Sequence, residues 1–187
     1  WLEKYEKKDI NDLIEVIELA ISDPILPAKH ILISGGTPTP IDYGYLSDVY
    51  KEITQKFNKR GVPVDIMLAA RSDLNYVNLL YSWGVNELAI NLEVWNDKIA
   101  KEIIPQKRTI NKDGWLKFIE KGVDVFGKDH IRSALLVGLE PIYDTLEGIR
   151  ELAKIGCMPM LSPFRPSPDT PLANVPSPAA EEIMSGV

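Results

Sequence analysis

The sequence predicts an α/β fold built on parallel strands, and three observations support this prediction. Short, almost continuous apolar runs alternate with segments of helical spacing along the chain. Strict alternation of strand and helix implies right-handed parallel units, which form either an open doubly wound sheet or a barrel. No Gly-x-Gly-x-x-Gly turn follows any predicted strand, and this disfavours a dinucleotide-binding sheet.

The predicted elements follow one another in a regular order. Apolar residues at helical spacing predict a helix over 10–21, which Pro24 and Pro27 then end. The run at 30–34 is nearly all apolar and stops at Gly35, as in a parallel strand that is covered on both faces. The same alternation predicts helices at 46–57, 74–83, 112–126 and 144–155, and strands at 64–70, 87–92, 132–137 and 157–162. Asp144 and Glu147 have the spacing of a capping box at the start of the last helix.

The length of 187 residues is near that of a single domain with one core. We expect a barrel core over 1–174 and a C-terminal extension over 175–187. The Pro- and Ser-rich segment 163–178 is expected to be extended and to leave the domain. Because the sequence begins at Trp1 and not at Met, we also expect that a segment N-terminal to it is missing.

Composition disfavours several classes of partner and site. The net charge of −6 and the lack of a long Lys/Arg block argue against nucleic acid as a partner. No apolar run approaches the roughly 20 residues that span a bilayer, so no membrane is expected. The single cysteine, Cys157, excludes an internal disulfide and a cysteine-only metal site, and favours the reducing cytoplasm. Cys157, His30 and His130 lie at the starts of predicted strands, where we expect structural roles.

Polar residues gather where the predicted strands end, which is where ligands bind in barrels and open sheets alike. Gly35 and Gly36, before Thr37, let the backbone approach a ligand and hold an ammonium or carboxylate group; the alternative is a tight turn without a ligand. Asn91 and Glu93 project to the same side of a strand end, where an amide and a carboxylate can grip a diol such as a ribose. The alternative is a helix cap beside a solvated acid.

Arginines are the candidates for binding an anion. Arg108 can meet a carboxylate through its bidentate fork, or it can be a solvated residue of a basic loop. Arg132 lies in an apolar strand, so its guanidinium needs an anionic partner unless it sits at the exposed start of that strand. Arg71 and Arg165 follow two other predicted strands.

In their order along the chain, these motifs resemble those of the radical S-adenosylmethionine (SAM) superfamily. The resemblance is to the branch of biotin synthase, lipoyl synthase and the hydrogenase maturase, and it runs from about residue 31 to residue 174. It implies a partial (β/α)6 TIM-type barrel in which strands 2 to 6 are present. The matching segments are Ser34-Gly35-Gly36-Thr37-Pro38, Asn91-Leu92-Glu93, Arg108-Thr109, the stretch 133–139 and the stretch 169–174.

The resemblance implies a binding site for SAM. Its residues would be Gly35, Gly36 and Thr37 for the amino group, Asn91 and Glu93 for the ribose, Arg108 for the carboxylate, Leu136 for the adenine, and Ser162. Enzymes of this family use a [4Fe–4S] cluster, reduced by a donor such as flavodoxin or ferredoxin, to cleave SAM to methionine and a 5′-deoxyadenosyl radical. The radical abstracts hydrogen from a substrate, here expected to be small and anionic, with Arg71, Arg132 and Arg165 as the candidates that bind it.

Three departures from the family pattern leave other interpretations open. The chain lacks the Cys-x-x-x-Cys-x-x-Cys loop that holds the cluster, so we expect it to be inactive alone. The acid of the fifth-strand motif comes one position early, as Glu140, and the interior cysteines of biotin synthase are absent, which disfavours sulfur insertion. The alternatives are a cluster-free (β/α) barrel lyase or aldolase and a non-catalytic SAM-binding relative.

Overall fold

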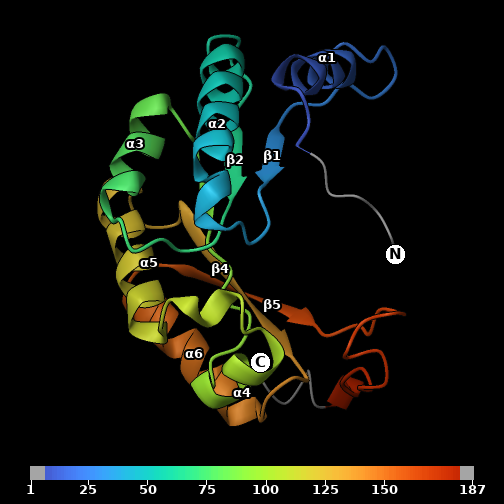
Figure 1. Ribbon diagram of the computed structural model, residues 1–187, viewed down its shortest axis with the longest axis vertical. Helices are drawn as coiled ribbons and strands as arrows, with labels where there is room; N and C mark the ends of the chain where they lie inside the picture. The colour runs from blue at the N-terminus through green and yellow to red at the C-terminus, as the bar shows by residue number, and fades with distance from the viewer. Residues whose placement is uncertain (1–6, 182–187) are drawn as a thin grey trace.

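The computed structural model describes residues 7–181, which form a curved parallel sheet with helices against it. The five strands lie in the sheet in the order in which they occur in the chain (Figure 1). Each helical connection therefore crosses over the same face. This arrangement confirms the predicted α/β fold, a partial TIM-type barrel. The strands are β1 (Ile31–Ser34), β2 (Val64–Met67), β3 (Leu88–Ala89), β4 (Ile131–Val137) and β5 (Met158–Pro163).

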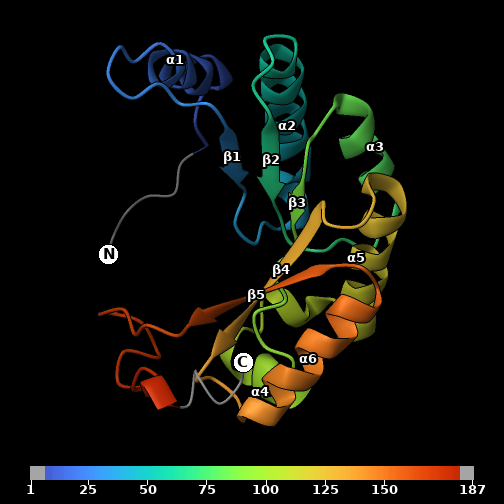
Figure 2. The same ribbon diagram turned by 180° about the vertical axis from the view of Figure 1, so that it is seen from behind.

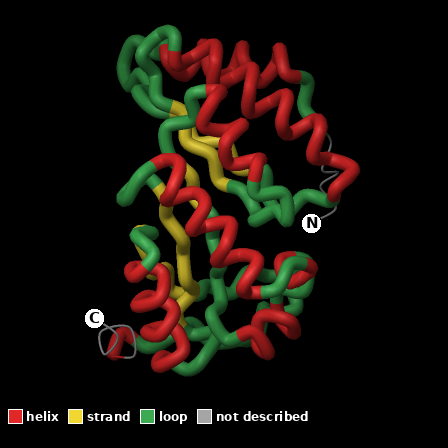
Figure 3. The backbone as a smooth tube through the Cα atoms, turned by 90° about the vertical axis from the view of Figure 1, so that its left-hand side faces the viewer, coloured by secondary structure: helices red, strands yellow, loops and turns green. Residues whose placement is uncertain are grey.

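Helices cover the outer face of the sheet and leave the inner face open. In Figures 1 and 2, the helices α2, α3, α5 and α6 lie together on one side of the strands. Figure 3 shows the same layering from the side. The helices are α1 (Ile10–Ile21), α2 (Tyr43–Asn58), α3 (Asn75–Trp83), α4 (Asp97–Ile103), α5 (Lys112–Phe126) and α6 (Ile142–Lys154), with short 3-10 helices at Pro40–Asp42 and Lys107–Thr109.

Strand β4 shows how the sequence divides the two faces. Its residues alternate between buried and partly exposed along all seven positions, from Ile131 to Val137. The buried set, which includes Leu135, faces the helices, whereas Ala134 and Leu136 face the open interior of the barrel. The edge strands β1 and β5 are more exposed on the side that faces the barrel interior: Leu32 is 50% exposed and Met160 is 46% exposed.

The core lies between the sheet and the helices. Helix α5 buries its apolar face against the strands, and α2 does the same. Many of the largest side chains that are almost fully buried belong to these two helices and to the strands they cover, among them Trp115, Tyr50, Phe57, Phe118, Ile53, Ile66, Leu88 and Ile131.

Three local predictions need correction. The sequence analysis missed α4, which begins after Asn96 because that side chain accepts hydrogen bonds from the amides of Lys98 and Ile99 at 3.1 and 3.2 Å. Asp144 forms no capping box, because α6 begins earlier, at Ile142, and the Asp144 carboxylate accepts a hydrogen bond from Asn96 Nδ2 at 2.8 Å.

The third correction concerns the tail, which returns to the barrel instead of leaving it. Pro178 packs so closely on Gly138, at the end of β4, that a Cβ atom added to the glycine would lie 2.8 Å from Pro178 Cδ. Part of the predicted extension, 182–187, lies outside the described residues. Among residues 7–181, no helix is both long and apolar enough to cross a bilayer.

Candidate functional site

A glycine turn follows β1 at the carboxyl edge of the sheet. Gly36 has a φ of +64°, a conformation that favours glycine, and a Cβ atom added there would meet nothing within 4 Å. Gly35 has no room for a side chain, because an added Cβ would lie 2.1 Å from the hydroxyl of Tyr50. The backbone of this turn is therefore open to a ligand at Gly36, whereas Gly35 packs on Tyr50.

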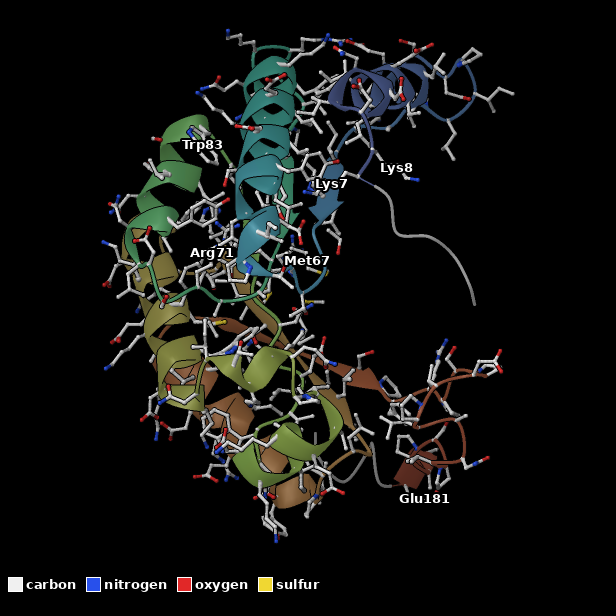
Figure 4. All side chains as sticks on the ribbon, viewed as in Figure 1. Lys7, Lys8, Met67, Arg71, Trp83 and Glu181 are labelled. Atoms are coloured by element: carbon white, nitrogen blue, oxygen red, sulfur yellow. The ribbon has the colours of Figure 1, made fainter. Side chains whose placement is uncertain are left out.

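A cavity of about 570 Å³ opens beside the glycine turn. Its wall contains Ser34, Gly35, Gly36 and Thr37 from the turn, and Lys7 from the segment before α1. Figure 4 shows Lys7 beside β1 and Met67 near the end of that strand. Two of the sequence-predicted groups, the glycines and Thr37, thus share one open wall.

Asn91 and Glu93 extend the line of β3 beyond its last paired residue and interlock with β4. The amide of Ala134 donates to Asn91 Oδ1 at 3.1 Å, while the amide of Glu93 donates to the carbonyl of Ala134 at 2.8 Å. Glu93 also accepts, through its carbonyl, the amide of Leu136 at 2.8 Å. These bonds hold Asn91, Glu93 and Leu136 at the same strand ends, as the sequence predicts.

Glu93 is held in an unusual backbone conformation and is paired with a lysine. Its φ is +67°, which costs a residue with a side chain about 1 kcal/mol or more. Lys107 Nζ lies 2.6 Å from Glu93 Oε1 and 3.0 Å from the carbonyl of Asn91. Trp115 fixes that lysine in turn, because the indole Nε1 donates to the Lys107 carbonyl at 2.8 Å. These contacts therefore position the carboxylate of Glu93, whose backbone is strained.

Lys107 was not among the residues predicted for the site. Lys107 and Arg108 are successive residues of a 3-10 turn, in which neighbours point about 120° apart. Only one of them can face the strand ends. Lys107 does so, and it lines a cavity of about 550 Å³ with Thr37, Tyr43 and Trp115.

Arg108 is turned into the protein. Its side chain is 1% exposed, donates to the carbonyl of Val94 at 2.6 Å and lies 3.4 Å from Asp97 Oδ1. Burial lowers the pKa of Arg108, and the charges of Asp97, Glu140 and Glu93 act in the opposite direction. As placed, Arg108 supports the connection between β3 and α4 and lines none of the cavities at the strand ends described in this section.

The edge of the sheet opposite β1 brings together Leu136, Ser162 and Arg165. They line a cavity of about 530 Å³ with Pro163 and Phe164, where β4 and β5 end side by side. Leu136 pairs with Ser162 in the sheet register, so both side chains face the barrel interior. An apolar side chain beside hydroxyl and guanidinium groups suits a flat polar ring such as a purine.

The other two candidate arginines lie elsewhere. Arg132 is at the entrance of β4, far along the strand from its carboxyl end, and pairs there with Asp65 and with Glu87 at 2.9 Å. His30 also pairs with Asp65, at 2.9 Å. These internal partners supply the anions that Arg132 needs. Arg71 stands after β2, between α2 and α3 (Figure 4).

Glu140 ties two of the connecting loops together. Its carboxylate accepts the amides of Trp95 at 3.0 Å and Asn96 at 2.6 Å, together with the hydroxyl of Thr145 at 3.1 Å. It is 6% exposed, so these bonds are shielded from water. This acid fixes the segment that leads out of Glu93, whereas its sequence position alone left its role undefined.

These residues fit SAM but do not provide ligands for an iron–sulfur cluster. The open turn at Gly35 and Gly36 can take an ammonium group, the Glu93 carboxylate can accept hydroxyl donors, and Leu136 offers an apolar surface. Cys157 is buried at the entrance of β5, and burial raises the pKa of its thiol to about 12. No group of three His, Cys, Asp or Glu side chains within residues 7–181 could hold a metal ion.

The sequence was compared with families and with curated proteins. No family model matches it. Over 103 residues, which are 54% of the chain, it is 33% identical to bacteriochlorophyllide c C-7(1)-hydroxylase from Chlorobaculum limnaeum. The chain spans 26% of the length of that relative, about a quarter.

The fold was compared with solved structures. The crystal structure of HydG, a maturase of the [FeFe]-hydrogenase, matches 97% of this chain with a TM-score of 0.74 and 17% sequence identity. Coproporphyrinogen III oxidase (HemN) from Escherichia coli, a radical SAM enzyme, matches 98% with a TM-score of 0.59 and 12% identity. The chain spans 42% and 45% of those two structures, less than half of each.

Proposed function

We propose that this chain binds S-adenosylmethionine across the ends of β1, β3 and β4. The premise is that the chain has the barrel fold and resembles the members of the radical SAM superfamily. The wider proposal is that the enzyme cleaves SAM reductively and abstracts hydrogen from a small, anionic substrate. The observation that carries the binding proposal is the Glu93 carboxylate, held by Lys107 at 2.6 Å beside the carboxamide of Asn91.

Each residue of the site would perform one part of the binding. Carbonyl groups of the turn at Gly35 and Gly36 would accept hydrogen bonds from the SAM ammonium group. The Glu93 carboxylate would accept from ribose hydroxyls, while the carboxamide nitrogen of Asn91 would donate to them. Leu136 would pack on the adenine, and Ser162 would offer a hydroxyl at its edge.

Lys107 would act on Glu93 in two ways. Its ammonium group orients the carboxylate and balances its charge at a site where SAM already brings a cationic sulfonium. The side chains of Lys107 and Glu93 are 15% and 26% exposed, so solvent screens this pair only in part.

When bound, SAM and a [4Fe–4S] cluster would supply the redox chemistry of this family. The residues of this chain would bind and orient SAM and exclude water from it, and within residues 7–181 no group of side chains is placed to hold the cluster. We propose that the ligands of the cluster lie outside this chain, and that the reductant is a protein such as flavodoxin or ferredoxin.

The boundaries of the SAM-binding unit are also a proposal. Residues 1–174 would form the barrel core and 175–187 an extension. The contact of Pro178 with Gly138 packs the start of this extension against the end of β4. Arg165 is exposed beside the Leu136 cavity, which supports a role for it in binding an anionic substrate.

SAM titration by calorimetry tests the binding proposal, first with SAM and then with 5′-deoxyadenosine plus methionine. Asn91→Ala and Glu93→Gln should each weaken affinity about tenfold, since each removes hydrogen bonds to the ribose. Asn78→Ala and Glu120→Gln remove the same groups from exposed helical positions and should leave affinity unchanged. Equal affinity in the wild type, Asn91→Ala and Glu93→Gln would disprove the site.

A further inference from the structure

Arg71 lies in an aromatic sandwich at the end of the β2 segment. Its guanidinium carbon is 3.9 Å from the centre of the Tyr43 ring and 3.6 Å from the centre of the Tyr76 ring. The two rings come from the starts of α2 and α3, between which Figure 4 places Arg71. Both rings are close enough for cation–π contacts, which hold the guanidinium in place.

Within residues 7–181, no carboxylate forms an ion pair with Arg71. Yet Arg71 is only 8% exposed. Asp73, two residues further on, is occupied, because its Oδ1 accepts the amide of Asn75 at 2.9 Å. A buried cation without an anion is costly, so this position is suited to an external anion.

The neighbouring hydroxyl of Tyr76 does not supply that anion. Burial raises the pKa of Tyr76, while a hydrogen bond with Ser47, the charge of Arg71 and a hydrogen bond with Arg71 act in the opposite direction. The Tyr76 and Ser47 oxygens are 3.0 Å apart. The phenol therefore stays neutral at ordinary pH and gives Arg71 no negative charge.

A cavity of about 350 Å³ adjoins Arg71 and carries positive charge on two sides. One side is Arg71 itself, and the other is the start of α5 with Lys117 one turn into the helix. Asn111 caps the amide of Gly114 at 2.8 Å, and the amides of Lys112 and Asp113, as the first two of the helix, have no carbonyl partner inside it. The same turn carries the carboxylate of Asp113, which does not line the cavity. The lining residues are Arg71, Ser72, Leu74, Thr109, Ile110, Asn111, Gly114 and Lys117, and they include no acid.

We propose that this cavity is an oxyanion site for a small molecule that carries a carboxylate or phosphate group. Arg71 binds the oxyanion through its planar fork, and Lys117 and the first turn of α5 complete the positive field. The hydroxyl group of Ser72 lines the same space and can donate a further hydrogen bond, whereas the Thr109 hydroxyl already donates to the carbonyl of Gln106 at 3.2 Å. The inference does not depend on SAM binding, because no residue assigned to SAM lines this cavity.

The test is calorimetry of the protein with inorganic phosphate and, separately, with acetate, at constant ionic strength in chloride. We expect saturable binding of at least one of them, and the stronger one identifies phosphate or carboxylate as the natural group. Arg71→Gln and Arg71→Lys should each weaken binding about tenfold, since lysine keeps the charge but lacks the fork. Lys117→Gln should weaken it about threefold.

Two controls keep the inference open to refutation. Lys51→Gln removes the same charge from an exposed position on α2 and should leave phosphate and acetate binding unchanged. If the Arg71 variants do not fold, Lys117→Gln and Ser72→Ala decide. No binding of either anion at about 50 mM, or equal binding by Lys117→Gln and wild type, would overturn the proposal.

Discussion

Gly35 should be intolerant of even a methyl group, for a reason that a second substitution can remove. In Gly35→Ala the new Cβ would lie 2.1 Å from the Tyr50 hydroxyl oxygen, which forces Tyr50 or the turn to move. Overpacking of this kind costs about 1–3 kcal/mol. Tyr50 is 1% exposed and belongs to the core, so it has little room to give way, and we expect the upper half of that range.

Tyr50→Phe removes the clashing atom. The nearest remaining ring atom, Cζ, would then lie 3.3 Å from the new Cβ, a contact that needs only a few tenths of an ångström of adjustment. In that background Gly35→Ala should cost less than about 1 kcal/mol, which gives a coupling energy of about 1–2 kcal/mol. Urea unfolding of the four proteins, followed by tryptophan fluorescence, measures each free energy of unfolding. An equal cost of Gly35→Ala in both backgrounds would refute the argument.

Three further outcomes follow from buried groups. Glu140→Gln should lower the free energy of unfolding by about 2–4 kcal/mol, because an NH₂ group would replace a carboxylate oxygen that accepts a backbone amide. A loss under about 0.5 kcal/mol would contradict this. Phe118→Ala should cost about 3–5 kcal/mol in urea unfolding, since Phe118 is fully buried in the core; Leu79→Ala, at an exposed position, is its control. Burial raises the pKa of Cys157 to about 12, so its thiol stays protonated. Iodoacetamide at pH 8 should therefore label Cys157 far more slowly in the native protein than in the urea-unfolded protein. Equal labelling rates, measured by mass spectrometry, would show that the thiol is accessible.

The order and type of the elements follow from hydrophobic period alone. The predicted helices at 10–21 and 112–126 match α1 and α5 residue for residue, because long amphipathic stretches with clear caps depend little on distant contacts. Strand β3 is shorter than the apolar run at 87–92, yet Ile90 continues the ladder by donating to the carbonyl of Arg132 at 2.8 Å. Helix α4 has too few turns for its period to be read.

The candidate site was predictable in part. The glycine turn, Asn91 and Glu93 follow predicted strands, so the edge on which they meet follows from topology. The partners of the charged residues do not. Asp65 reaches Arg132 across 67 positions of sequence, and Lys107 rather than Arg108 faces Glu93 because of the rotation of a single 3-10 turn. Such choices depend on packing, which no local pattern contains.

At Glu93, which has a positive φ, the residue that best fits the backbone differs from the residue that best fits the proposed site. Glycine at position 93 would adopt φ +67° without the steric cost and would relax this strand end by about 1 kcal/mol. The same substitution would delete the carboxylate that Lys107 holds. Relief of backbone strain and retention of the proposed SAM-binding carboxylate therefore call for different residues at position 93.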